Sequence, residues 1–201
     1  MGDFLEIFYV KDLKMVDVRK YDGVENGRYA WTFLGYDIVA TDKEGRAVSI
    51  LSDEETMKHY PKPYDKKGVQ RWIDWSLDNY QKYGFGLWAI VLKETGEFIG
   101  DCGITLQNID GEQLPEIGYH VHKHHWRKGY AKEAASAVRD WAFRNTPYIS
   151  LYSYMTSTNI ASYSTAMSIG MSKVKEYIDS NNIPHVVYKM TKQEWEQKYV
   201  K

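Results

Sequence analysis

Cysteine and long apolar runs are scarce in this chain of 201 residues. Cys102 is the only cysteine, so the chain forms no internal disulfide, and no CxxC pair is present to hold zinc. No apolar run approaches the ~18 residues that a membrane span requires. The first residues also lack the basic segment and apolar core of a signal peptide. We therefore expect a protein of the reducing cytoplasm with no membrane partner.

An excess of charge of either sign is also missing. Lysine and arginine total 26, aspartate and glutamate total 27, and the formal net charge is −1. A general nucleic-acid binder normally carries a basic excess or a basic stripe, so we expect no nucleic-acid partner. With 43% hydrophobic residues, the chain is able to bury a sizeable core without a metal or a disulfide.

What the chain does contain is an alternation of strand and helix patterns, typical of a mixed α/β domain. The helical patterns cover residues 69–84, 130–146 and 159–169. The strand patterns cover residues 87–93, 98–107, 114–122, 148–155 and 185–190. Residues 42–57 have a weaker pattern that is compatible with a short helix.

Residues 124–134, "HHWRKGYAKEA", place Arg127, Lys128 and Gly129 directly before a helix. Basic side chains oppose the helix dipole at that end unless an anion docks there. The free N–H groups of a first helical turn bind phosphate, and a glycine lets the ligand approach closely. Two interpretations stay open on this stretch alone: a phosphate site, or an ordinary loop with solvated basic residues.

Two longer strings resemble the signature of the GNAT acetyltransferases. The first is "PEIGYHVHKHHWRKGYAKEA" at residues 115–134, and the second is "NIASYSTAMSIGM" at residues 159–171. Residues 51–64 and 96–105 resemble the branch that includes the ribosomal-protein N-terminal acetyltransferases. The resemblance implies an α/β GNAT fold: a mostly antiparallel central sheet, flanked by helices, with one splayed parallel strand pair.

The resemblance also implies that the chain binds acetyl-CoA as a co-substrate. The pantetheine arm would enter between the strand Glu116–His122 and its parallel neighbour Tyr148–Tyr154, and the pyrophosphate would lie on backbone amides at the start of the next helix. Asn159 begins the second acetyl-CoA element. The implied binding residues are therefore His120, Val121, His122, Arg127, Lys128, Gly129, Tyr130, Ala131, Lys132 and Asn159.

The implied reaction is direct, sequential transfer of an acetyl group to a primary amine, in a small molecule or at a peptide N-terminus. Glu116 matches a strand glutamate that serves as general base in some members; the alternative is a carboxylate paired with a neighbouring Arg or Lys. Many relatives use a tyrosine as acid where this chain has Ala166. In the ribosomal-protein branch the serine of Asn-x-x-Ser is a proposed proton donor, so the resemblance implies this role for Ser162, with Tyr163 as second choice or as a packing residue.

Several features leave alternatives open. A catalytically silent acyl-CoA sensor or interaction module would keep the same binding motifs, and a homodimer is one expected assembly. Residues 1–37 do not match the usual start of the family domain, here placed at 38–201, and form a β-rich extension. This extension either covers a sheet edge, forms a dimer contact or caps the acceptor site. Trp72 and Trp75 either line that site or pack in the core.

Three other signals have simpler interpretations. The histidines at 120, 122, 124 and 125 lack a carboxylate or cysteine at a metal-ligand spacing, so we expect no metal. "GFGLWA" at residues 84–89 precedes a strand, which is the wrong context for dinucleotide binding. Cys102 lacks a partnered base and is interpreted as a packing residue.

Overall fold

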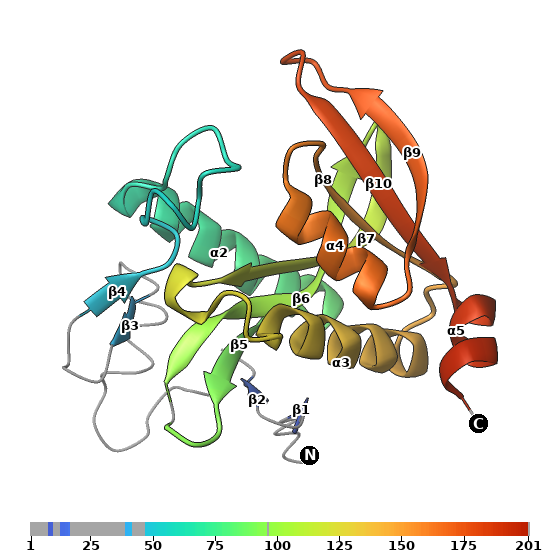
Figure 1. The fold of residues 1–201 in the computed structure, drawn as a ribbon, viewed down its shortest axis with the longest axis horizontal. Coiled ribbons are helices and arrows are strands. Elements are labelled where there is room, and N and C mark those ends of the chain that lie inside the picture. The colour runs from blue at the N-terminus through green and yellow to red at the C-terminus, as the bar shows by residue number, and fades with distance from the viewer. Residues whose placement is uncertain (1–7, 10–12, 17–38, 42–46, 96, 201) are drawn as a thin grey trace.

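The computed structural model describes residues 8–9, 13–16, 39–41, 47–95 and 97–200 (Figure 1). Their centre is an eight-stranded sheet in the order β1-β2-β5-β6-β7-β8-β10-β9, with a separate β3-β4 pair. The strands are β1 Phe8–Tyr9, β2 Leu13–Val16, β3 Val39–Thr41, β4 Ala47–Ser49, β5 Leu87–Leu92, β6 Phe98–Ile109, β7 Glu112–Val121, β8 Ser150–Thr156, β9 Ser172–Ile178 and β10 Pro184–Thr191. The helices are α2 Lys66–Tyr83, α3 Tyr130–Asn145, α4 Ile160–Ser168 and α5 Lys192–Tyr199, with a 3-10 turn at Lys123–His125.

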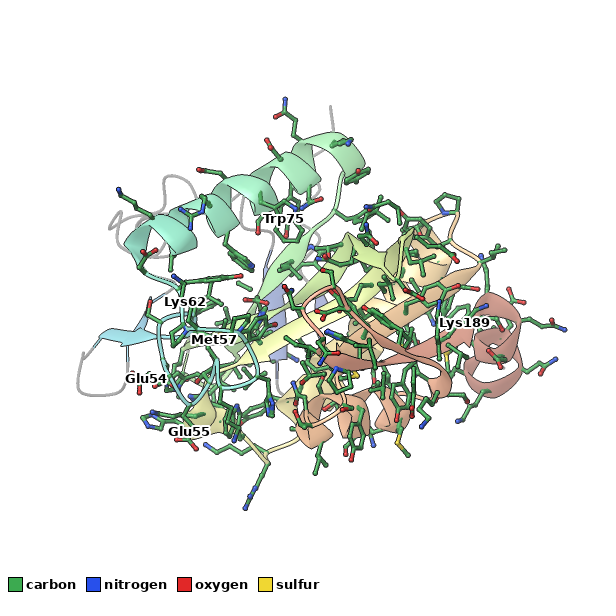
Figure 2. All side chains as sticks on the ribbon, turned by 90° about the horizontal axis from the view of Figure 1, so that it is seen from above. Glu54, Glu55, Met57, Lys62, Trp75 and Lys189 are labelled. Atoms are coloured by element: carbon green, nitrogen blue, oxygen red, sulfur yellow. The ribbon has the colours of Figure 1, made fainter. Side chains whose placement is uncertain are left out.

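Helices cover both faces of the sheet. Figure 2 shows α2 on one side of the strands, with α4 on the other. On the first side, the Tyr80 hydroxyl of α2 donates a 2.7 Å hydrogen bond to the Leu87 carbonyl. On the second side, the rings of Trp88 and Trp141 meet edge to face at 4.9 Å, which joins β5 to α3. The apolar core therefore lies in two layers, one on each face of the sheet.

One strand pair in the sheet is parallel, as the family resemblance predicts. β7 and β8 run parallel and share one register pair, Glu116 with Tyr152. The other neighbouring strands in the sheet are antiparallel, and β6 and β7 pair over ten consecutive positions. The mixed α/β fold with a splayed parallel pair is therefore confirmed.

The predicted helices occur close to their expected positions. Asp65 caps α2 by accepting a hydrogen bond from the Gly68 N–H, and Gly84 ends the helix in the left-handed conformation with φ 80°. Pro147 follows soon after the end of α3, as a helix-terminating residue should. The short helix considered at residues 42–57 is absent from the described part, where residues 47–49 form β4 and residues 50–57 form turns; residues 42–46 lie outside it.

Two elements near the C-terminus have no counterpart in the sequence prediction. β9 is an edge strand whose side chains are mostly exposed, so it lacks the alternation that signals a half-buried strand. α5 begins with a capping box between Thr191 and Glu194. Its buried Trp195 donates a 2.7 Å hydrogen bond to Asp140 of α3, which fixes α5 against that helix.

The N-terminal strands extend the sheet. β2 pairs with β5, and β1 pairs with β2. The predicted boundary between residues 37 and 38 falls outside the described residues and stays a prediction. No helix in the described part of the chain combines the length and apolarity that crossing a membrane requires.

The register of β5, β6 and β7 predicts that alanine substitutions at two paired glycines, Gly103 and Gly118, differ in their effect on stability. A Cβ on Gly103 would overlap the Gly86 carbonyl, whereas a Cβ on Gly118 would meet only ordinary contacts at 3.7 Å or more. Gly103→Ala should therefore lower the free energy of unfolding by about 1–3 kcal/mol. Urea denaturation measures this, and equal stability of the two alanine variants would contradict the assigned register.

Candidate active site

The candidate site is built on the two faces of β7. Side chains alternate along a strand, so Glu116 and His120 share one face and Tyr119 points to the other. The ring of Trp72 on α2 lies 6.2 Å from His120, which places the first face under α2. The Tyr119 hydroxyl reaches Ser162 on α4. The predicted base and the predicted acid therefore approach β7 from opposite sides.

Glu116 has the features of a base that works near neutral pH. Burial raises the pKa of its carboxyl group to about 7, although His120 and a hydrogen bond from the Tyr154 backbone N–H act in the opposite direction. One carboxylate oxygen lies 3.7 Å from the position of a Cβ on Gly118, so the group leans along the strand toward His120. Among the described residues, Glu116 forms no ion pair with Arg or Lys, which argues against the alternative role predicted for it.

His120 is held between two oxygen atoms. Its Nδ1 lies 2.9 Å from Asp101 Oδ1, and its Nε2 lies 2.7 Å from the Tyr60 hydroxyl. Burial alone would lower the pKa of His120, but the charges of Asp101 and Glu116 and the hydrogen bond to Asp101 raise it above its ordinary value. His120, predicted as a cofactor contact, therefore directs its side chain to the same face as Glu116.

Ser162 lies in the first turn of α4. Its hydroxyl is 3.2 Å from the Tyr119 hydroxyl, which also donates a 2.7 Å hydrogen bond to the Ser162 carbonyl. Asn159 caps the helix, because its side-chain oxygen accepts a 3.1 Å hydrogen bond from the Ser162 N–H. Tyr163 stacks on Tyr188 at 6.3 Å and packs against the core, which fits its packing role.

The start of α3 has the backbone geometry of an anion site. Gly129 precedes the helix with φ 87°; within the described part of the chain, no side chain caps this end and a Cβ on Gly129 would meet no atom within 4 Å. Arg127 also has a positive φ, 61°, and its side chain and that of Lys128 are exposed. The next N–H groups, those of Tyr130, Ala131 and Lys132, have no intrahelical acceptor because they lie in the first turn.

The backbone groups of β7 divide between its two neighbours. The His122 N–H donates a 2.9 Å hydrogen bond to the Ile99 carbonyl on the β6 side. Bonded positions alternate along an antiparallel ladder, so His120 also directs its backbone groups to β6. Tyr119 and Val121 direct theirs toward β8, where the Val121 carbonyl accepts a 2.7 Å hydrogen bond from the Trp126 indole.

The remaining sequence signals have structural interpretations. The described residues contain no group of three or more metal-binding side chains. Burial lowers the pKa of His122 to about 4, and His125 lies 3.1 Å from Glu97. Cys102 is fully buried, and this burial raises the pKa of its thiol, as expected of a packing residue.

The two tryptophans of α2 lie on the Glu116 side of the sheet. Trp72 packs against the core, as one of its two predicted roles requires, and its ring also meets that of His120. The rings of Trp72 and Trp75 are 6.5 Å apart, and Trp75 is labelled on α2 in Figure 2. Sequence reasoning missed three polar residues of this site: Asp101, Tyr60 and Tyr119.

Comparison with protein families gives a direct match. The family model described as an acetyltransferase (GNAT) domain matches residues 37–172. YkkB of Bacillus subtilis (strain 168), an uncharacterized protein, is 37% identical over 139 residues, covering 69% of this chain and 80% of YkkB. YjdG of the same strain, named as an uncharacterized N-acetyltransferase, is 33% identical over 131 residues, covering 65% of this chain and 77% of YjdG.

Solved structures show the same fold. A GNAT-family acetyltransferase from Bacillus anthracis superposes with a TM-score of 0.66 at 17% identity, covering 94% of this chain and 99% of that one. The ribosomal-protein-S5-alanine acetyltransferase from Vibrio fischeri superposes with a TM-score of 0.63 at 14% identity, covering 94% and 98%.

The raised pKa of Glu116 predicts a pH-dependent difference in stability. As pH rises, the unfolded chain loses this proton near pH 4.5 and the folded chain near pH 7. The stability that neutral Glu116 contributes is therefore complete below pH 4.5 and is lost as pH rises through about 7. Over that range Glu116→Gln should gain stability relative to wild type, by on the order of 3 kcal/mol.

Urea denaturation at several pH values measures this difference. Glu112→Gln, which changes an exposed carboxylate on the same strand, is the matched control and should follow wild type. A constant difference between Glu116→Gln and wild type from pH 4 to 8 would contradict the burial of this carboxyl group.

Proposed function

The chain belongs to the GNAT acetyltransferase family, and on that premise we propose that it transfers acetyl groups from acetyl-CoA directly to primary amines. The acceptor is a small molecule or a peptide N-terminus. The observation that supports this most is the half-buried Glu116, whose carboxyl pKa is raised to about 7 and which lies at the point where β7 and β8 diverge. A proton acceptor tuned to neutral pH is what an amine nucleophile needs.

The proposed site for the pyrophosphate is the start of α3. Of the residues that the structure describes, none lies within 4 Å of a Cβ on Gly129 and none caps the helix with its side chain. The first-turn N–H groups point at the ligand, and charge-assisted hydrogen bonds of this kind contribute about 1.5–3 kcal/mol each. The amides of residues 127–132 fit the group, with the exposed side chains of Arg127 and Lys128 adding positive charge.

The pantetheine arm is proposed to lie in the opening between β7 and β8. The Ile99–His122 hydrogen bond turns the backbone of His120 and His122 toward β6. We therefore assign the backbone pairing to Tyr119 and Val121, with the Val121 N–H as donor because the Val121 carbonyl already has the Trp126 indole as partner. Asn159 contributes by fixing the first turn of α4 beside this opening.

Glu116 is proposed to accept a proton from the acceptor. An alkyl ammonium with a pKa near 10.4 keeps its proton at pH 7, so exposing the lone pair costs roughly 4–5 kcal/mol. Glu116 offsets part of this cost by accepting a proton, directly or through water, as the nitrogen attacks the thioester carbonyl. Because Glu116 lies on the α2 face of the sheet, the amine is proposed to bind on the face where Trp72 lies.

Ser162 is proposed to protonate the departing thiolate. Its hydroxyl lies on the α4 side of β7, opposite Glu116, so the two proton transfers are separated by the strand pair. Tyr119 stands 3.2 Å from this hydroxyl and orients it, while its own proton is donated to the Ser162 carbonyl. Tyr119 thus places a phenol hydroxyl on β7. Position 166 on α4 has no such hydroxyl, because it holds a buried alanine.

The remaining parts of the proposal concern the setting of the enzyme. We propose that it works in the cytoplasm without nucleic acid or membrane, with a homodimer as the assembly to be tested by sedimentation. The proposed domain is residues 38–201. Residues 1–37 are proposed as an added segment that covers a sheet edge, supported by the pairing of β2 with β5.

A direct assay tests this function against the silent-sensor alternative. The purified full chain is incubated with acetyl-CoA and a panel of amines, and free thiol is followed with mass detection of the product. The panel contains metabolite amines, polyamines, antibiotic amines and short peptides, including an alanine peptide suggested by the ribosomal-protein neighbour. Tight binding of acetyl-CoA by calorimetry without transfer to any amine would support the sensor and contradict the enzyme.

Substitutions at the two proposed catalytic residues should lower the rate without releasing the cofactor. We expect Glu116→Gln to lower kcat by about 10²–10⁴-fold, the usual contribution of a general base. Ser162→Ala should lower kcat more than it lowers affinity for acetyl-CoA. Ser164→Ala is the matched control, because Ser164 lies exposed on the same helix. Unchanged turnover in Ser162→Ala would remove Ser162 from the mechanism.

A further inference from the structure

A chain of three polar side chains lies beside Glu116 and has no part in the mechanism above. Asp101 on β6 and His120 on β7 are register partners, and their side chains meet at 2.9 Å. The other nitrogen of His120 lies 2.7 Å from the Tyr60 hydroxyl, which comes from the segment between β4 and α2. The three groups therefore join the interior of the sheet to the surface under α2.

The inner end of this chain is a fully buried carboxylate. Asp101 is 0% exposed, and its second oxygen, Oδ2, has no hydrogen-bond partner among the residues that the structure describes. An isolated buried charge is costly, so Asp101 is stabilised when His120 carries a proton next to it. The side chain of His120 is 13% exposed, which keeps the pair away from bulk water.

The outer end is a phenol that reaches the surface. Tyr60 is 41% exposed, but its hydroxyl points inward to His120. If Asp101 accepts the Nδ1–H of neutral His120, Nε2 is the acceptor and the Tyr60 O–H is the donor. The lone pairs of the Tyr60 oxygen are then left to accept a hydrogen bond from another group.

We propose that Asp101, His120 and Tyr60 form a second proton path that receives one of the two protons lost by the acceptor nitrogen. The proposal rests on the proposed function, because an ammonium that becomes an amide must lose two protons. Glu116 accepts one of them. The Tyr60 oxygen accepts the other while its own proton passes to His120.

The proton transfer balances within the three residues. One N–H bond of the ammonium breaks and a new O–H bond forms on Tyr60. At the same time the original O–H bond of Tyr60 breaks and an Nε2–H bond forms on His120. The product is an imidazolium paired with the Asp101 carboxylate, and its proton returns to solvent through Tyr60.

The charges around His120 favour this direction. Asp101 from β6 and Glu116 from β7 both raise the pKa of His120, whereas burial lowers it. Trp72 from α2 contributes an uncharged ring edge. Tyr60 keeps its proton at neutral pH, because burial of its hydroxyl and the nearby carboxylates of Glu116 and Asp101 raise its pKa.

NMR of the histidine rings tests the chain without needing turnover. In the wild-type protein we expect the neutral form of His120 to carry its proton on Nδ1 and its pKa to exceed the ordinary 6.5. Asp101→Asn should lower that pKa, because it removes the charge and the hydrogen bond that raise it. A neutral form protonated on Nε2, or a pKa that is unchanged in Asp101→Asn, would overturn the proposal.

The kinetics of a variant that lacks the Tyr60 hydroxyl test the function of the proton path. Tyr60→Phe should lower kcat at least 10-fold, shift the pH dependence of kcat, and leave the affinity for acetyl-CoA within twofold. Tyr64→Phe is the matched control, because it removes a phenol from the same segment and leaves this chain intact. A Tyr60→Phe variant with wild-type kcat and pH profile would overturn the path alone, whereas no transfer by wild type to any amine would overturn the proposed function.

Discussion

The divergence of β7 and β8 from their single pairing at Glu116 and Tyr152 is the constraint on which the site depends. β7 is fully paired with β6 on its other side, so it cannot shift to close the gap. In the described sheet, Tyr119 and Val121 consequently have no ladder partner on β8, and the Val121 carbonyl bonds to the Trp126 indole instead. A ligand with its own amide groups can take the place of the missing strand.

The same divergence separates two chemical environments. The α2 side of β7 presents Glu116 and the pair of His120 and Asp101, which are groups that accept protons. The α4 side presents the hydroxyls of Tyr119 and Ser162, which are groups that donate them. A thioester held between the strands would meet the nucleophile from one face and its proton donor from the other. In the proposed mechanism, the strand pair therefore separates the base from the acid.

Local patterns were enough to predict much of this arrangement. The helices predicted at residues 69–84, 130–146 and 159–169 follow from sequence signals whose physics is local, and they correspond to α2, α3 and α4. The family resemblance supplied the splayed pair. β9 was missed because its exposed side chains carry no alternation, and α5 because it depends on one buried residue, Trp195, docking on α3.

The polar residues of the site were harder to predict because they meet only through long-range pairing. Asp101 and His120 are 19 positions apart, and Tyr60 lies 60 positions before His120. Only the strand register puts Asp101 opposite His120. Tyr119 was overlooked because the conventional position for a phenol is on α4, where this chain has Ala166.

A crystal structure with a non-hydrolysable acetyl-CoA analogue tests the central claim most directly. The account predicts the diphosphate on the amides that begin α3 at Gly129, with the pantetheine arm between β7 and β8 and paired with Tyr119 and Val121. An analogue bound elsewhere, or a complex in which β7 and β8 pair continuously past Glu116, would contradict it.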